Sequence, residues 1–415
     1  MKEGKAMLVF NESLRNRFIG YTVYDTMSDG ENAAKVRPST PGQEVLLLAL
    51  KKELEEMGLE TYYGDEKVVM GTLRGNSGEK TVGFMAHVDT ASDCEGNGVK
   101  AKVWKNYDGG KIVLDGGTVL DPETTDKDLL LYKGGEIITS DGTTLLGSDD
   151  KAGVAIIMEM LQYFVSNPEV KRPNIEVYFT PDEETGRGMD RFPYDRLKST
   201  CCYTVDGGPE GQLETECYNA ASVFIKIHGV SIHLGDARGR LVNAVTVGSK
   251  IVSALPQAES PEATDGRYGY YCPYSFKGGT AEAELTVVIR DFDREKFEAR
   301  IENTESIAKT VGRAYGAEVE VETKISYRNM VEANRNDPSS TEAVYAAAEK
   351  LGLVLHDELI RGGTDGARLA ETGVAAPNLF TGGHNLHSKS EWVALDAMNR
   401  STNLCIGIAK YWSEK

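Results

Sequence analysis

The sequence predicts an α/β protein in which a domain with a mixed sheet flanked by helices is interrupted by an inserted, ferredoxin-like α+β domain. Three observations predict this arrangement. Short apolar runs alternate with helical patterns over residues 1–217, alternating strand patterns and two helices fill residues 218–328, and the first pattern returns over residues 329–415. We therefore expect a discontinuous first domain, 1–217 with 329–415, and an inserted domain at 218–328.

Each element expected in the first domain has its own local signal. The segment 39–58 predicts a helix, because Ser39 or Thr40 can cap it, Pro41 suits its first turn and Gly58 can end it. Apolar β-branched runs predict buried strands, and stretches rich in Gly and Asp predict loops and hairpins. The strands are expected at 68–73, 81–89, 175–180, 201–208 and 376–380, the loops and hairpins at 90–140, and further helices at 151–167, 340–352 and 398–412.

The insert is expected to have the order strand, helix, strand, helix, strand. A small domain of this kind can close over a neighbouring site, and its exposed strand edge is a candidate surface for pairing two subunits. The strands alternate apolar and polar residues at 219–230, 281–293 and 318–327, and the helices are expected at 243–255 and 294–316.

The composition argues against several classes of function. A formal net charge of −18 would repel nucleic-acid phosphates. The N-terminal stretch MKEGKAMLVFNESLRNRF has only a short apolar run, so we expect no signal peptide, no membrane span and a cytoplasmic location. Six cysteines without a C-x-x-C pair argue against a disulfide framework and against a thiolate zinc site.

Histidines and carboxylates cluster where the predicted strands end. Side chains two residues apart on a strand point the same way, so His87 and Asp89 would emerge together. Open α/β sheets place their sites at the carboxyl ends of strands. Taken alone, His87 is also compatible with a structural histidine and Asp150 with a helix cap. The other residues at such positions are Asp149, Glu183, Glu184, Asp206, His384 and His387.

Converging carboxylates raise one another's pKa unless a cation lies among them, so a divalent metal is the economical solution. Imidazole and carboxylate ligands without thiolate suit catalytic Zn²⁺, with Co²⁺ or Mn²⁺ as substitutes. Three carboxylates, two neutral imidazoles and two divalent cations leave one positive charge, which a bridging hydroxide would neutralise. The side chains in this count are His87, Asp149, Glu184, Asp206 and His387.

Five motifs in order along the chain carry a resemblance to a known family: AHVDT, GSDDKAG, DEETGRG, TVDGG and NLHSK. The sequence resembles the co-catalytic zinc metallopeptidases, which include carboxypeptidases, aminoacylases and desuccinylases. PSTPGQ, IRDFDREKFEAR, RGGTDGARLAETG and PNLFTGG make it similar to the peptidase T branch, the tripeptide aminopeptidases. The resemblance spans nearly the whole chain and implies a zinc-peptidase-like catalytic domain with an inserted lid domain.

The resemblance implies two zinc ions per subunit. His87 and Asp206 would bind one ion. Glu184 and His387 would bind the other, and Asp149 would bridge the two. The implied reaction is release of the N-terminal residue from tripeptides that have a free N-terminus.

The same motifs imply catalytic roles for two further acids. Asp89 would orient His87, as carboxylates commonly orient metal-bound imidazoles. Glu183, which lies beside a ligand without being one, would accept a proton from the attacking water and pass it to the leaving amine. His384 is expected to lie near the site or on the surface without binding metal.

Four residues resemble substrate-binding positions of the family. His233 stands in a turn where Leu234 replaces the proline of the family's His-Pro-Gly pattern, and a purely structural role in that turn is the alternative. Arg290 has a competing interpretation as an exposed, salt-bridged strand end. The four residues are His233, Asn243, Arg290 and Arg361.

Two other functions stay open. The chain could be a related di-zinc amidohydrolase, such as an aminoacylase, desuccinylase or carboxypeptidase, or a homologue that has lost catalysis. The G-x-S-x-G elbow, the H-E-x-x-H helix and the Walker loop are absent from the sequence, so serine hydrolysis, zincin chemistry and nucleotide binding lack support.

Overall fold

The computed structural model describes residues 7–415, so the first six residues of the N-terminal stretch considered above lie outside the described part. Contacts divide the chain into two compact units. The first runs to Thr215 and also contains Glu332–Glu358 and Thr364–Lys415, and the second contains Glu216–Val331 and Leu359–Gly363. Within the described residues, no helix combines the length and the apolar character required to cross a membrane.

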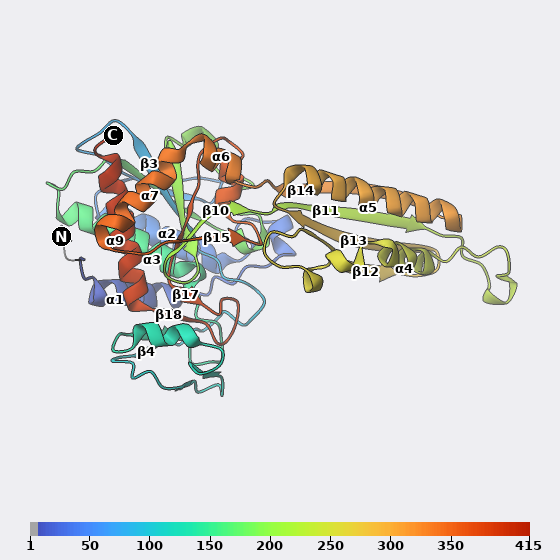
Figure 1. The fold of residues 1–415 in the computed structure, drawn as a ribbon, viewed down its shortest axis with the longest axis horizontal. Helices are drawn as coiled ribbons and strands as arrows, with labels where there is room; N and C mark the ends of the chain where they lie inside the picture. The colour runs from blue at the N-terminus through green and yellow to red at the C-terminus, as the bar shows by residue number, and fades with distance from the viewer. Residues whose placement is uncertain (1–6) are drawn as a thin grey trace. The chain divides into compact units, whose positions relative to one another are not determined.

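The first unit is built on an eight-stranded sheet with the order β1-β2-β8-β3-β9-β16-β10-β15. Strands β3, β10 and β15 of this sheet are labelled in Figure 1. The neighbours β8, β3, β9 and β16 run parallel, whereas β1, β2 and β10 pair in antiparallel fashion. The predicted mixed sheet is therefore confirmed. The strands are β1 Glu60–Tyr63, β2 Val69–Leu73, β3 Thr81–His87, β8 Asn174–Thr180, β9 Cys201–Gly207, β10 Gln212–Cys217, β15 His356–Ile360 and β16 Asn378–Phe380.

Helices cover both faces of this sheet. Val82, Phe84 and Ala86 of β3 pack into a core shared with α1, α2, α3, α7 and α9, whereas Met85 joins a smaller cluster with Leu369 of α8 on the opposite face. Burial of each large apolar side chain contributes about 1.5–3 kcal/mol. The helices are α1 Asn11–Thr22, α2 Pro41–Glu56, α3 Ser148–Ser166, α6 Val331–Asn336, α7 Pro338–Leu351, α8 Asp365–Ala370 and α9 Leu395–Trp412.

A second, four-stranded sheet in the first unit has the order β17-β18-β7-β4 and its own small core around Trp392. It brings the segment that contains His387 next to the chain that leads into α3, because β18 pairs with β7. The hairpin β5–β6 lies in the region where loops and hairpins were predicted. These strands are β4 Lys102–Trp104, β5 Ile112–Val113, β6 Val119–Leu120, β7 Ile137–Thr139, β17 Gly383–His384 and β18 Trp392–Ala394.

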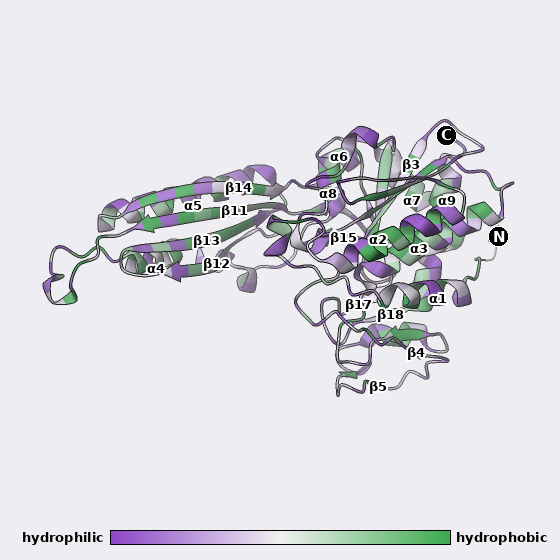
Figure 2. Ribbon diagram, turned by 180° about the vertical axis from the view of Figure 1, so that it is seen from behind, coloured by the Kyte–Doolittle hydropathy of each residue, from purple (hydrophilic) through white to green (hydrophobic). Residues whose placement is uncertain are grey.

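The second unit is a four-stranded antiparallel sheet, ordered β12-β13-β11-β14, with α4 and α5 packed on one face. Figure 2 shows hydrophilic and hydrophobic residues interspersed along α5. Phe297 and Ala308 are among the residues that this helix buries. The order β-α-β-β-α-β is ferredoxin-like, as predicted, but it contains one strand more than the expected order of strand, helix, strand, helix, strand. Its elements are β11 Asn219–His228, α4 Ala244–Ala254, β12 Tyr270–Gly278, β13 Glu282–Asp291, α5 Arg294–Tyr315 and β14 Glu318–Tyr327.

Strand β12 was not predicted from the sequence. This edge strand contains Pro273, and from that residue to Gly278 its residues are exposed, so it lacks the alternation that marks its neighbours.

The close packing of α3 on the sheet generates a stability prediction. A Cβ atom at Gly153 would overlap the carbonyl oxygen of Val205 in β9 and the carboxylate of Asp150. Gly153→Ala should therefore lower the free energy of unfolding by about 1–3 kcal/mol, as overpacking typically does. Urea unfolding of the purified protein measures this difference.

Gly20→Ala in α1 is the matched control, because no atom lies within 4 Å of the Cβ position there. Alanine is the better helix former, so this change should stabilise the protein by up to about 1 kcal/mol. If Gly153→Ala unfolded at the wild-type urea concentration, the tight contact between α3 and β9 would be refuted.

Candidate metal centre

The side chains expected to bind metal converge at the carboxyl edge of the parallel strands. His87 is the last residue of β3 and lies opposite Thr180 at the end of β8. The turn that follows β8 carries Glu184, and Asp206 lies near the end of β9. Parallel strands bring their carboxyl ends to one edge of a sheet, so short chain segments suffice to bring these residues together.

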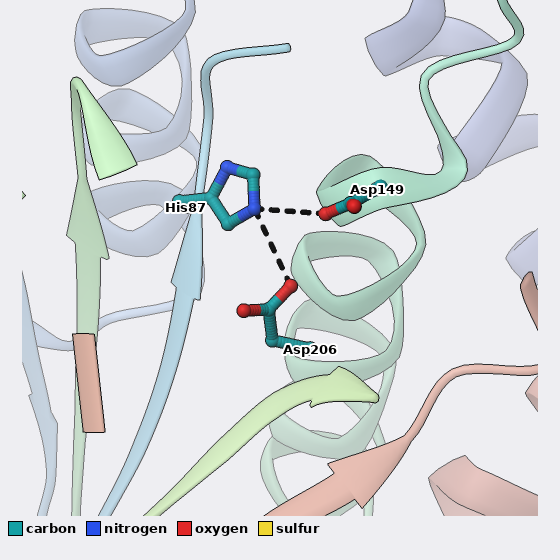
Figure 3. Close-up of side chains that lie close together, drawn as sticks. All are labelled: His87, Asp149 and Asp206. Atoms are coloured by element: carbon teal, nitrogen blue, oxygen red, sulfur yellow. Dashed lines mark hydrogen bonds and ion pairs between the residues drawn. The ribbon is translucent and has the colours of Figure 1, made fainter. Parts of the chain in front are cut away.

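The first group of metal-ligand atoms contains His87, Asp149 and Asp206 (Figure 3). The Nε2 atom of His87 lies 2.9 Å from Oδ1 of Asp149 and 3.3 Å from Oδ1 of Asp206. All three potential ligand atoms lie within 4.8 Å of one another. An imidazole and two carboxylates at this spacing can hold one divalent cation.

The second group contains Asp149, Glu184 and His387. The Nε2 atom of His387 lies 3.3 Å from Oδ2 of Asp149 and 3.0 Å from Oε1 of Glu184. Asp149 thus belongs to both groups and presents a different oxygen to each, as a bridging carboxylate does. Among the described residues, Oε1 of Glu184 is buried and accepts no hydrogen bond, which suits a metal ligand better than an acceptor for His387.

The pKa shifts at the site reflect the same juxtaposition. Burial lowers the pKa of His87, but the carboxylates of Asp206 and Asp149 outweigh it and raise the pKa well above its ordinary value. The neighbouring carboxylates of Asp149 and Glu184 raise the pKa of His387 to about 11. Burial raises the pKa of Asp206 and of Glu184 to about 7. A divalent cation bound among these groups would displace the protons that the raised pKa values favour.

Glu183 lies beside the two groups without belonging to either. With His87, Asp206 and Asp365 it lines a narrow gap that is too small to hold a water molecule. Burial raises the pKa of Glu183 well above its ordinary value, and the charges of Asp206, Asp365 and Glu184 add to the effect, while His87 opposes it. A carboxyl group in this position can take up and release a proton next to a metal centre.

Asp89 supports both His87 and the turn that carries the two glutamates. The Nδ1 atom of His87 lies 3.0 Å from the main-chain oxygen of Asp89 and 3.4 Å from its Oδ1. The carboxylate accepts hydrogen bonds from the main-chain N–H groups of Glu183 at 3.0 Å and Glu184 at 3.1 Å. Asp89 therefore contacts His87, as expected, and in addition holds the main chain at Glu183 and Glu184.

Asp182 is a buried residue of the same turn, with φ of 61°. Its carboxylate accepts hydrogen bonds from the N–H of Ser39 and from the side-chain amide of Gln43, and Oε1 of Gln43 accepts from the N–H of Asp182. The PSTPGQ motif therefore stabilises, through these hydrogen bonds, the turn that contains Glu183 and Glu184. Sequence reasoning noted this motif but assigned Gln43 no role.

Asp150 and His384 lie close to the ligands in sequence but belong to neither group. Asp150 accepts hydrogen bonds from the N–H of Gly153 at 3.1 Å and from that of His87 at 3.3 Å, so its interpretation as a helix cap is supported. The ring of His384 stacks on Trp392 with centroids 3.8 Å apart, and its Nδ1 contacts the main-chain oxygen of Gly382.

Asp365 is a second site residue that sequence reasoning missed. It is buried, its Oδ2 accepts a hydrogen bond from the hydroxyl of Thr180 at 2.6 Å, and burial raises its pKa to about 6. It lies in the RGGTDGARLAETG motif, which had been noted only as part of a resemblance. Its proximity to Glu183 could not be read from local sequence.

The four residues expected to bind substrate all lie in the second unit. The His233 side chain is 84% exposed, and its Nδ1 accepts from the N–H of Gly235. Asn243 caps α4 through the N–H groups of residues 245 and 246. The guanidinium of Arg290 donates to main-chain oxygens at 221 and 289, and that of Arg361 donates to those at 264 and 266.

Neither of these arginines forms an ion pair within the described residues, although Arg300 in the same unit pairs with both Asp291 and Glu259. The alternative of a salt-bridged strand end therefore finds no support for Arg290.

Comparison with known proteins gives a consistent assignment. The family model described as Peptidase family M20/M25/M40 matches residues 141–410. Proteins named peptidase T from Clostridium novyi and Listeria monocytogenes are 41% and 42% identical to this chain, covering 97% of it in each case and 100% and 99% of their own lengths.

Solved structures agree in fold. Aminopeptidase PepT from Bacillus cereus and a tripeptidase from Staphylococcus aureus each match with a TM-score of 0.77, at 22% and 21% identity, covering 98% and 99% of this chain and all of theirs. A Bacillus subtilis protein described as a dinuclear metal-binding peptidase of the M20 family matches with a TM-score of 0.68 at 16% identity, over 98% of this chain and 99% of its own. The chain therefore belongs to peptidase family M20/M25/M40, and within that family to the peptidase T group.

Proposed function

We propose that this chain is a metal-dependent aminopeptidase that removes the N-terminal residue from tripeptides. The observation that carries the proposal is the position of Asp149, whose two oxygens each face an imidazole and a second carboxylate. This arrangement occurs in a chain whose relatives at 41–42% identity are named peptidase T.

The residues present fit two divalent cations. His87 and Asp206 would hold one, Glu184 and His387 the other, and Asp149 both. Nitrogen and carboxylate donors without thiolate favour Zn²⁺, with Co²⁺ or Mn²⁺ as substitutes. When bound, the ions would supply an activated water and polarise the scissile carbonyl.

The chain's own residues would then move the proton and hold the reacting groups. Glu183 would accept the proton of the attacking water and deliver it to the leaving amine. Asp89 would keep Glu183 beside the ligands through the hydrogen bond to its N–H, and would orient His87 through Nδ1.

The second unit would bind the rest of the peptide and close over the site as a lid. Arg290 and Arg361 have no carboxylate partner among the described residues, so they could pair with the carboxylate of a short peptide. His233 and Asn243 would contact its carbonyl groups. The domain division at 218–328, a homodimer through the exposed edge of the lid and a cytoplasmic location remain predictions of the same proposal.

Glu183→Gln should abolish tripeptide cleavage while leaving two metal ions bound. Loss of the general base should lower kcat by about 10²–10⁴-fold. Glu184→Gln is the matched neighbour, and it should instead lower the metal content because its oxygen belongs to the second ligand group. Metal analysis and hydrolysis of di-, tri- and tetrapeptides measure both effects.

Cleavage that survives in Glu183→Gln would remove this residue from its assigned role. N-acylated amino acids distinguish the related amidohydrolases. If the wild type hydrolysed those and ignored tripeptides, the tripeptidase proposal would be wrong.

Metal affinity should rise with pH. In the metal-free protein the pKa of His387 is raised to about 11, so its imidazole carries a proton at neutral pH that a metal must displace. Each proton displaced strengthens apparent affinity about tenfold per pH unit. Chelator competition between about pH 6 and about pH 8, with proton release followed in weak buffer, tests this direction. An affinity independent of pH would contradict the ligand role of the imidazoles.

His233→Ala should impair peptide hydrolysis without affecting stability or metal content. Because its side chain is 84% exposed, its removal leaves no cavity. Loss of one hydrogen bond to substrate should lower kcat/KM about tenfold or more. Leu234→Ala, at a residue 73% exposed in the same turn, is the control and should act like wild type. Unchanged kinetics in His233→Ala would refute the contact.

A further inference from the structure

Glu391 is a buried carboxylate that accepts hydrogen bonds from a single short loop, and it has no assigned role so far. The residue is 1% exposed. Its Oε2 accepts from the N–H groups of Leu146 at 2.7 Å and Gly147 at 2.9 Å. Its Oε1 accepts from the N–H of Ser148 at 2.7 Å, the hydroxyl of Ser148 at 2.6 Å and the N–H of Asp149 at 3.3 Å. No cation among the described residues lies within ion-pair distance of it, although the charge of the buried Lys151 acts on it from further away. These N–H and hydroxyl donors are therefore its direct partners.

The loop held in this way carries Asp149, which belongs to both groups of potential metal ligands. Asp149 has φ of −89° and ψ of 102°, which are not helical values, so the regular hydrogen bonds of α3 do not fix its main chain. Glu391 supplies the missing restraint by binding its N–H and those of the three preceding residues. The restraint matters because Asp149 must direct one oxygen to each ligand group.

Glu391 also connects this loop to the other end of the chain. It follows His387 by four residues and directly precedes Trp392, the first residue of β18. Strand β18 pairs with β7, and the N–H of Glu391 donates to the main-chain oxygen of Ser388. One anchored segment therefore supplies both His387 and the carboxylate that holds Asp149.

We propose that Glu391 is a positioning residue that ties the Asp149 loop to the His387 segment, so that both ligand groups are formed together. The inference rests on the proposed metal-dependent function. This role requires a carboxylate, because only a side chain that has acceptors and no donors can accept hydrogen bonds from all of these N–H groups. In Glu391→Gln, the new NH₂ would face two main-chain N–H groups whichever way the amide turned.

The test compares Co²⁺ binding by wild type and Glu391→Gln, using chelator competition and the visible absorption of bound Co²⁺. We expect affinity to fall about 10–100-fold for both ions, as removal of a residue that supports metal ligands typically does. The Co²⁺ spectrum should change as well, and kcat should fall more than KM rises, because the contacts to peptide are untouched.

Glu176→Gln is the matched control. Glu176 is 2% exposed and accepts hydrogen bonds from Tyr178, Lys198 and Ser199, but it lies near the start of β8, whereas the metal centre lies beyond the end of that strand. The Glu176→Gln variant should lose about as much stability as Glu391→Gln, and it should bind Co²⁺ with wild-type affinity.

The outcomes separate the two claims. If the wild type bound no Co²⁺, the proposed function and this inference would both fail. If the wild type bound two ions and folded Glu391→Gln bound them equally well, only the inference would be overturned.

Should Glu391→Gln not fold, Ser148→Ala decides, since it removes only the hydroxyl donor. Weaker Co²⁺ binding at an unchanged melting temperature would support the inference, and unchanged binding would overturn it.

Discussion

Hydrogen bonds from main-chain N–H groups to buried carboxylates are the interaction on which the site depends. Glu391 binds the loop before α3, Asp89 binds the N–H groups of Glu183 and Glu184, and Asp182 binds that of Ser39. A buried carboxylate that accepts hydrogen bonds from several main-chain N–H groups fixes the direction of the main chain that it binds. These hydrogen bonds therefore hold the loops of the site although the loops lack regular secondary structure.

The site therefore contains two kinds of carboxylate. The first kind accepts hydrogen bonds from main-chain N–H groups, and the second kind belongs to the two groups of potential metal ligands. Asp149, Glu184 and Asp206 have imidazoles as their close partners, and Oε1 of Glu184 accepts no hydrogen bond within the described residues. Burial accordingly raises the pKa of Glu184 and Asp206 to about 7. The adjacent Glu183 and Glu184 both donate their N–H groups to Asp89. Only the side chain of Glu184 belongs to a group of potential metal ligands.

The sequence was sufficient to predict the fold class and to nominate the residues that converge, because both leave local signals. His87, Asp206 and the Glu183–Glu184 pair follow recognisable apolar strands, and parallel strands end at one edge. The contact between Glu391 and Ser148 spans 243 positions and has no such signal, since an acid in SKSEW resembles an ordinary surface residue. Gln43 and Asp365 stayed without roles for the same reason. Strand β12 was not predicted because an exposed edge strand need not alternate apolar and polar residues.

The charge balance of the second unit supports a substrate role for two of its arginines. Arg300 is neutralised by Asp291 and Glu259, as expected of a structural guanidinium. Arg290 and Arg361 instead donate to main-chain oxygens and lie over the rings of Tyr327 and Tyr218. Carbonyl dipoles and aromatic faces hold a guanidinium in place without cancelling its charge. In a chain with a net charge of −18, two such cations favour an anionic ligand, and the carboxylate of a short peptide has the geometry that a guanidinium binds best.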